Sequence, residues 1–171
     1  MKLFLKRKTH IGVALGLFFA NYVLDRVTKY IASVYLKDSE PVRLLKDTIL
    51  LLYAENTGAF LSLGTHWNIY IKYFVLLIIP LIICIIGLLY VMLKEIKLYR
   101  IAIISCIIGG GIGNLVDRLC NEFKVIDFIN FGIGRLRTGI LNAADLSVTF
   151  GAILLMIYET IIKKEKDQNK M

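Results

Sequence analysis

Long runs of apolar residues constrain this chain more than any other feature of its sequence. A bilayer core is spanned by about 20 mostly apolar residues in helical form. Residues 11–24, 73–93 and 101–116 carry no charge, and residues 139–158 carry only one, on Asp145. We therefore predict four transmembrane helices, at about residues 11–33, 69–93, 101–119 and 142–162.

The predicted fold class is an all-α membrane protein with four transmembrane helices, in a single integral membrane domain covering residues 1–171. Apolar residues make up 57% of the chain, well above their share in soluble globular domains. An alternative for the first apolar run is a cleaved signal peptide, because basic residues precede it. No small-x-small cleavage site follows the run and three further spans do, which favours a transmembrane helix.

Basic residues in the short loops predict how the chain is oriented in the membrane. Four Lys or Arg lie in residues 1–10, three in residues 94–100 and four in residues 163–171. Four spans place these three segments on the same side of the membrane. We expect that side to be the cytoplasm, so both termini should be cytoplasmic.

Two longer segments, about residues 34–68 and 120–141, lie on the opposite side in this arrangement. In the first segment, the runs VRLL and TILLLY have the composition of short β-strands. Lys46 and Asp47 lie between the two runs and are suited to a turn. We therefore expect a small extracytoplasmic β-sheet at the outer surface.

The charge and the metal-binding residue types exclude several classes of function. The net charge is +8, but Lys and Arg lie mostly between and beyond the apolar runs, so we expect no nucleic-acid partner. Cys84 and Cys106 lie inside apolar runs, and a total of three cysteines is no disulfide framework. His10 and His66 are far apart, and no Cys-x-x-Cys occurs. We therefore expect neither a metal nor any other cofactor.

Polar groups that are costly in a membrane gather at one depth of the predicted bundle. They come from the outer ends of the first, third and fourth helices: Asp25, Lys29, Asn114, Asp117, Arg118 and Asp145. Charges inside spans usually face a partner or a wet cavity. The cytoplasmic ends carry only basic residues, which reach the interface by extending their side chains. A functional site is therefore expected at the outer membrane boundary.

Each of these residues also has a simpler structural interpretation. Asp25 and Lys29 are four residues apart and can form an ordinary helix ion pair. Asn142 and Asp145 can form a helix N-cap with an acid three residues later. Arg118 can extend to lipid head groups. Three such coincidences would have to share one membrane face, so the combination favours a site.

A non-enzymatic four-span protein that binds or transports an ion or a lipid is the competing interpretation. Ionisable groups of a transport pathway should be spread across the depth of the membrane. The inner halves of the predicted helices lack such groups apart from Glu159. This distribution favours a site at one face over a pathway through the bilayer.

Glycines precede the polar end of the third predicted helix. Gly109 and Gly113 form the spacing Gly-x-x-x-Gly, which lets the backbones of two membrane helices approach closely. We expect these glycines to act in packing and to hold Asn114 and Arg118 against neighbouring helices.

Five sequence blocks resemble the motifs of lipoprotein signal peptidases, also called signal peptidase II. The run GGGIGNLVDRL at 109–119 is similar to the family's GGAxGNxxDR. DRVTK at 25–29 is similar to DxxTK, and NTGAF at 56–60 is similar to NxGAxF. VIDF at 125–128 is similar to V-V/I-D-F, and LNAAD at 141–145 is similar to FNxAD. The blocks occur in the family's order, and together they are highly specific.

The resemblance implies a membrane aspartic endopeptidase that cleaves bacterial prolipoproteins just before a diacylglyceryl-modified cysteine. It implies that Asp127 and Asp145 form the catalytic pair. The remaining motif residues would support this pair or bind substrate: Asp25, Lys29, Asn56, Gly58, Asn114, Asp117, Arg118 and Asn142. The implied location is the bacterial cytoplasmic (inner) membrane, with the site near the outer face and lipid-modified prolipoproteins and membrane phospholipids as partners.

Within this motif set, Asp117 is expected to be a supporting carboxylate. Its neighbour in the chain is Arg118, which favours a permanently ionised acid that holds the guanidinium. Two positions depart from the family's pattern. Gly111 stands where Ala is frequent, and Leu141 replaces the usual Phe, so packing near Asp145 is expected to differ.

Orientation is open to a direct test. With the native cysteines replaced by serine, a cysteine introduced at Lys97 should react with a membrane-impermeant maleimide only after the cells are opened. The reason is the cluster of basic residues at 94–100, which favours the cytoplasmic side. Labelling of this cysteine in intact cells would contradict the predicted topology.

Overall fold

Four long helices dominate the structure, a computed structural model that describes residues 2–59 and 63–168, with side chains for residues 8–59 and 63–161. The helical elements are α1 (Lys2–Tyr35), α2 (Ile69–Lys72), a π-helical segment (Tyr73–Ile78), α3 (Ile79–Leu93), α4 (Leu98–Cys120) and α5 (Ala143–Gln168). Four stretches are long and apolar enough to cross a membrane: Lys8–Tyr35, Ile69–Leu93, Leu98–Cys120 and Ala143–Ile161. The predicted fold class is therefore confirmed, although α1 is longer than the apolar run from which it was predicted.

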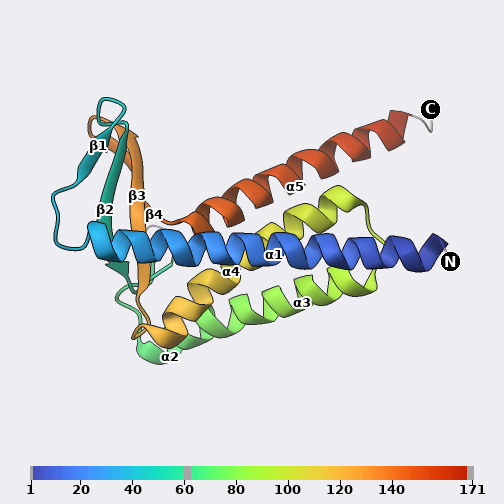
Figure 1. Cartoon of the computed structure of the whole chain (residues 1–171), viewed down its shortest axis with the longest axis horizontal. Coiled ribbons are helices and arrows are strands. Elements are labelled where there is room, and N and C mark those ends of the chain that lie inside the picture. The colour runs from blue at the N-terminus through green and yellow to red at the C-terminus, as the bar shows by residue number, and fades with distance from the viewer. Residues whose placement is uncertain (1, 60–62, 169–171) are drawn as a thin grey trace.

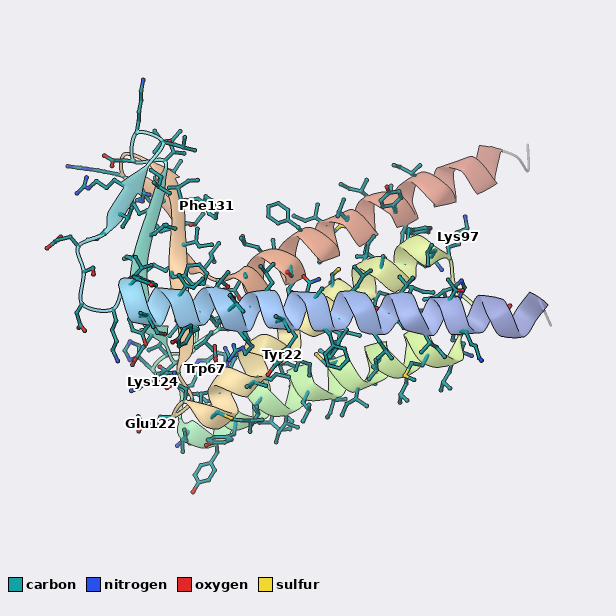
Figure 2. The ribbon with its side chains drawn as sticks, in the orientation of Figure 1. Tyr22, Trp67, Lys97, Glu122, Lys124 and Phe131 are labelled. Carbon is teal, nitrogen blue, oxygen red and sulfur yellow. The ribbon has the colours of Figure 1, made fainter. Side chains whose placement is uncertain are left out.

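The two ends of the bundle differ in what they carry. Figure 1 shows a β-sheet at one end, and the start of α1, the α3–α4 connection and the end of α5 at the other. Figure 2 places Trp67 at the sheet end and Lys97 at the opposite end. The sheet and the basic loop at 94–100 therefore lie at opposite ends of the bundle.

A proline explains why the second span changes its helical form near its start. Pro80 lies in the first turn of α3 and follows the π-helical segment Tyr73–Ile78. Proline has no backbone N–H to donate, and its ring clashes with the carbonyl four residues earlier. A widened π turn relieves that clash and keeps the span continuous. The span is therefore a single membrane crossing, Ile69–Leu93, with a local change of winding.

The sheet has four antiparallel strands in the order β1-β2-β3-β4: Val42–Leu44, Ile49–Asn56, Val125–Ile133 and Leu136–Leu141. The sequence predicted β1, β2 and the turn between them, where Lys46 and Asp47 have positive φ angles of 53° and 66°. β3 and β4 were not predicted. They pair with the first hairpin through β2 and β3, so the two outer segments of the chain form one sheet.

Close helix contacts depend on glycines of α4, as the sequence predicted. A Cβ on Gly109 would lie 2.5 Å from the backbone oxygen of Phe18, and a Cβ on Gly113 would overlap the carboxyl group of Asp25. A Cβ on Gly110 would lie 2.9 Å from the backbone oxygen of Ala144. The adjacent glycines Gly109 and Gly110 thus allow α1 to pack closely against one side of α4 and α5 to pack closely against another. This packing brings polar residues of three helices together below the sheet.

The packing can be tested by adding a single carbon. Gly109→Ala should lower the free energy of unfolding by about 1–3 kcal/mol, because the new Cβ meets a backbone atom that cannot rotate away. Gly16→Ala is a matched control, since a Cβ there has nothing within 4 Å and gains the same helix propensity. Thermal unfolding in detergent measures both, and equal midpoints for the two variants would contradict the packing argument.

Candidate functional site

The two proposed catalytic acids approach one another from different kinds of structure. Asp127 lies on β3, and Asp145 lies in the first turn of α5. Leu141, the last residue of β4, pairs with Ile129 of β3, so the chain enters α5 directly beside the strand that carries Asp127. The sheet and the helix are therefore joined at the point where the two acids lie.

Asn142 binds both carboxylates. Its Oδ1 accepts a hydrogen bond from the backbone N–H of Asp145 at 2.9 Å, and its own N–H donates to Asp145 Oδ2 at 3.3 Å. This reciprocal pair is a capping box at the start of α5. The side-chain Nδ2 of Asn142 donates to Asp127 Oδ1 at 2.6 Å. The helix cap considered from the sequence is thus present, and the same residue also joins the two acids.

Asp127 is buried, with 2% of its surface exposed. Its Oδ2 accepts from Asn56 Nδ2 at 3.0 Å, in addition to the bond from Asn142. Burial away from water and, second to it, the negative charge of Asp145 raise the pKa of Asp127 to about 6, although the hydrogen bonds from Asn56 and Asn142 act in the opposite direction. An acid in this position holds a proton at a pH where an exposed aspartate has lost it.

Asn114 connects Asp145 to a buried positive charge. Its Nδ2 donates to Asp145 Oδ1 at 2.8 Å. Its Oδ1 accepts from Lys29 Nζ at 2.7 Å and from Asn142 Nδ2 at 3.1 Å. An ammonium group can only donate, so the amide oxygen must point toward Lys29. The amide N–H₂ must then point toward Asp145.

Lys29 belongs to a cluster of four charged side chains between α1 and α4. Its Nζ lies 2.9 Å from Asp25 Oδ2 and 2.7 Å from Asp117 Oδ2. Arg26 bridges the same two acids, at 2.7 Å from Asp25 and 2.6 Å from Asp117. Asp25 Oδ1 also accepts from the backbone N–H of Ala144, in the first turn of α5, at 3.1 Å. The helix ion pair considered from the sequence is therefore one part of a network that ties three helices together.

The predicted contact between Asp117 and Arg118 is wrong. The partners of Asp117 are Lys29, Arg26 and, at 3.4 Å, the backbone N–H of Ile126. Asp117 therefore points toward α1, while Arg118 points toward residues 56–59. Arg118 donates to the backbone oxygen of Gly58 at 2.7 Å.

The outer segment is held to the site by Asn56 as well as by Arg118. Asn56 Nδ2 donates to the backbone oxygen of Ala59 at 3.1 Å, and its Oδ1 accepts from the N–H of Gly58 at 2.8 Å. The same amide group reaches Asp127. Residues 56–59 are therefore fixed beside the two acids.

Arg26 is the site residue that sequence reasoning missed. It occupies a variable position of the DRVTK block, so the resemblance gave it no role. Its position beside Asp25 inside an apolar helix was an available signal, because a charge at that depth calls for a partner. The structure supplies two carboxylates and the backbone oxygen of Gly113, at 2.9 Å, as those partners.

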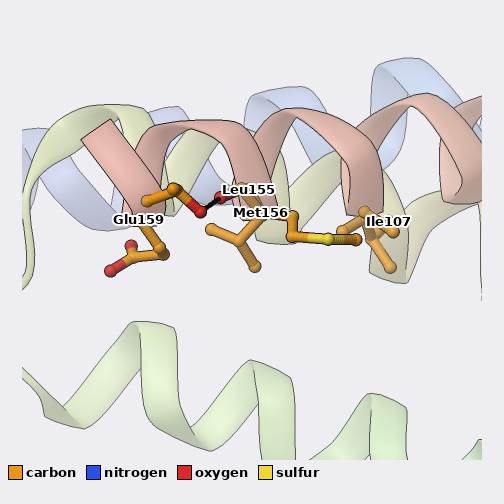
Figure 3. Close-up of a pocket in the computed structure, with 6 residues that line it drawn as sticks. Ile107, Leu155, Met156 and Glu159 are labelled. Carbon is orange, nitrogen blue, oxygen red and sulfur yellow. Dashed lines mark hydrogen bonds between the residues drawn. The ribbon is translucent and has the colours of Figure 1, made fainter. Parts of the chain in front are cut away.

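One hollow of the surface lies away from these groups. A shallow hollow of about 440 Å³ lies between α4 and α5, lined by Ile107, Ala152, Leu155, Met156, Glu159 and Thr160 (Figure 3). Glu159, the acid of the inner half, pairs with Arg100, whose Nε lies 2.6 Å from Oε1. The hollow is mostly apolar and offers no pair of acids, so it does not compete with the Asp127–Asp145 region as a catalytic site.

The chain is similar along most of its length to one group of membrane proteins. A family model described as signal peptidase (SPase) II matches residues 17–161. The lipoprotein signal peptidase of Borrelia hermsii is 32% identical over 164 residues, which cover 93% of this chain and 95% of the relative. That of Chlorobium phaeobacteroides is 33% identical over 157 residues, which cover 86% and 90%.

A solved structure agrees with these relatives in fold. A bacterial membrane enzyme determined by the in meso method at 2.3 Å resolution superposes with a TM-score of 0.76 and 27% identity. The match covers 92% of each chain. It includes both the helices and the sheet, because neither part alone would reach that coverage.

The charge interaction between the two acids can be measured separately from any reaction. Asp145→Asn should lower the pKa of Asp127 below about 6, because the substitution removes the negative charge that opposes ionisation. Burial remains, so the pKa should stay above that of an exposed aspartate. Infrared titration of the carboxyl band measures the pKa of Asp127, and Asp47→Asn, which removes an exposed acid, is the control. An unchanged or higher pKa for Asp127 in Asp145→Asn would contradict the coupling.

Proposed function

The chain belongs to the signal peptidase II family, and we propose that it removes signal peptides from bacterial prolipoproteins by an aspartic mechanism. Asp127 and Asp145 are the catalytic pair in this proposal. The observation that carries it is the bonding of Asn142 to both carboxylates, at 2.6 Å for Asp127 and 3.3 Å for Asp145. One residue thereby fixes two acids that lie on separate elements.

The two acids take different roles because their surroundings differ. Asp145 accepts from Asn114, whose orientation is set by the ammonium group of Lys29. Each acid is bound by two N–H donors, so the difference lies in the cation behind Asn114, which favours the ionised form of Asp145. Among the described residues, neither donor of Asp127 contacts a cation directly. We therefore assign the shared proton to Asp127, whose pKa of about 6 supports this role.

Peptide hydrolysis then proceeds with every proton accounted for. Asp145 takes a proton from water, and the water oxygen attacks the scissile carbonyl carbon while Asp127 gives its proton to the carbonyl oxygen. The tetrahedral intermediate returns one proton to Asp127. Asp145 gives its proton to the leaving amine as the carbon–nitrogen bond breaks. Both acids end in the state in which they began.

The remaining motif residues support the pair or the substrate. Asn56, Gly58 and Arg118 hold residues 56–59 beside the acids, so the outer segment 34–68 is suited to cover a bound peptide. Asp25, Lys29 and Asp117 hold the ends of α1, α4 and α5 in register. The cleaved bond would be the one just before the diacylglyceryl-modified cysteine.

The proposed setting is the bacterial inner membrane, with both termini in the cytoplasm and the acids near the outer face. The sheet and the acids lie at the end of the bundle opposite the 94–100 loop, which supports this orientation (Figure 1). Signal peptide and lipid anchor are both membrane-borne, so a site at this depth receives them directly. Residues 1–171 then act as a single integral domain that contacts phospholipids and no nucleic acid.

Removing either acid should abolish the reaction. Asp127→Asn and Asp145→Asn should each lower cleavage of a purified lipid-modified prolipoprotein by a factor of about 10³ or more, and the double variant should lose little further activity. Asparagine keeps the shape of aspartate but can neither take the proton from water, as Asp145 does, nor give an acidic proton to the carbonyl oxygen, as Asp127 does. Asp47→Asn, an exposed acid of the β1–β2 turn, is the control that should retain activity.

Asp117 provides a sharper comparison, because it lies at the same end of the bundle without contacting Asp127 or Asp145 in the described residues. Asp117→Asn should chiefly lower the amount of folded protein, since it leaves Arg26 and Lys29 with one acid between them. Efficient cleavage by a folded Asp127→Asn, together with none by a folded Asp117→Asn, would overturn the assignment of the pair.

A further inference from the structure

The strand that carries Asp127 also carries a row of apolar side chains. Side chains of a strand alternate between its two faces, so Ile129, Phe131 and Ile133 share the face of Asp127. Asp127 contacts the start of α5 through Asn142, which means that this face is turned toward the helices. Figure 2 shows Phe131 on that side of β3.

The neighbouring strands extend this row across the sheet. Residues directly opposite each other in a sheet share a face. Ile49 pairs with Phe131, Leu44 pairs with Ile49, and Leu136 pairs with Ile133. The resulting surface, here called the apolar sheet face, consists of Leu44, Ile49, Ile129, Phe131, Ile133 and Leu136.

No helix of the described residues covers the far end of this face. Ile133 lies six residues beyond Asp127, about 20 Å along the strand. Figure 1 shows the turns of both hairpins extending past the first turns of α5. Ile133 and Leu136 are 79% and 85% exposed, and Leu44 is 41% exposed. Three large apolar side chains are thus presented together on a surface that the bundle does not reach.

At this overhanging end, basic side chains lie on the opposite face and in the turns. Arg43, which alternates with Leu44, has 71% of its side chain exposed. Arg137, which alternates with Leu136, donates to Asn130 and to the backbone oxygen of Asp47. Lys46 and Arg135 lie in the two turns and are exposed. The overhanging end of the sheet is therefore amphipathic, with its apolar side toward the helices and its charged side away from them.

The direction of the apolar sheet face selects its occupant. The strands run crosswise to the helices (Figure 1), so this face is perpendicular to the helix axes and is turned toward the membrane that the helices cross. An amphipathic element with Lys and Arg at its edge is suited to lie in the membrane interface. Basic side chains there extend to phosphate groups while the apolar side meets acyl chains.

We propose that the apolar sheet face rests on the outer leaflet, with Ile133 and Leu136 in contact with phospholipid acyl chains and Lys46 and Arg135 beside phosphate groups. The inference needs only that the four helices cross the membrane, and "outer" follows the orientation proposed above. It does not depend on which residues catalyse the reaction. Contact with lipid would fix the height of β3, and therefore of Asp127, relative to the bilayer surface.

The test places a fluorescent side chain on each face of the full-length protein. In a Trp67→Phe background, Ile133→Trp and Leu136→Trp report on the apolar sheet face, and Arg43→Trp is the matched control on the opposite face. Each variant is reconstituted in vesicles of phosphatidylethanolamine and phosphatidylglycerol, with or without bromine on the acyl chains. Both sheet-face probes should emit at shorter wavelength than the control and lose about half of their emission to the brominated lipid.

Each alternative gives a distinct result that overturns the proposal. Long-wavelength emission without quenching at both probes would place the face in water. Short-wavelength emission without quenching would place it against protein, such as a second copy of the chain. Equal quenching of the Arg43→Trp control would mean that lipid contact is not specific to the face. Two independent probes keep the test valid if one variant fails to fold, and cleavage activity is not needed to interpret it.

Discussion

Lys29 places a positive charge inside the helix bundle, where only 2% of its side chain is exposed. A charge at that depth is tolerated in a membrane only when it is paired. Asp25, Asp117 and Arg26 complete a set of two positive and two negative groups, so the cluster has no net charge. Losing any member would leave an uncompensated charge, which is why α1 and α4 are held in one register. Gly113 makes room for the cluster, because a Cβ there would overlap Asp25.

The geometry of the two acids follows from this cluster by a short series of hydrogen bonds. Lys29 orients Asn114, Asn114 binds Asp145, and Asn142 joins Asp145 to Asp127. Asp25 binds the first turn of α5 through Ala144. The acid on the helix and the acid on the sheet are therefore positioned by the same buried charges. Preorganisation of this kind avoids the cost of rearranging polar groups during the reaction.

Local features of the sequence predicted much of this arrangement. Apolar runs bounded by charges predict membrane helices directly, and the shared depth of Asp25, Asn114 and Asp145 followed from the predicted topology. The first hairpin was visible because two strand-like runs flank a Lys46-Asp47 turn. β3 escaped prediction because apolar and polar residues are mixed on both of its faces, so it shows no simple alternation.

The partners within the polar cluster could not be predicted, since pairing depends on which helix faces meet. Adjacency in the chain suggested Arg118 for Asp117, whereas the helix turns Asp117 toward Arg26 and Lys29. Asn142 was recognised as a possible cap, but its bond to Asp127 requires β3 to lie beside the start of α5. That placement comes from the pairing of β3 with β4 and is visible only in three dimensions.

The pH profile of Lys29→Gln tests the central claim most directly, because Lys29 contacts neither of the two proposed catalytic acids in the described residues. The positive charge of Lys29 lowers the pKa of Asp127, so its loss should raise that pKa and move the alkaline limit of activity to higher pH. The value of kcat should fall about tenfold or more as Asn114 loses its fixed orientation, while KM changes little. Lys37 is an exposed lysine just beyond α1, so Lys37→Gln should have the kcat and the pH profile of the wild type. A folded Lys29→Gln with the kcat and pH profile of the wild type would contradict the account.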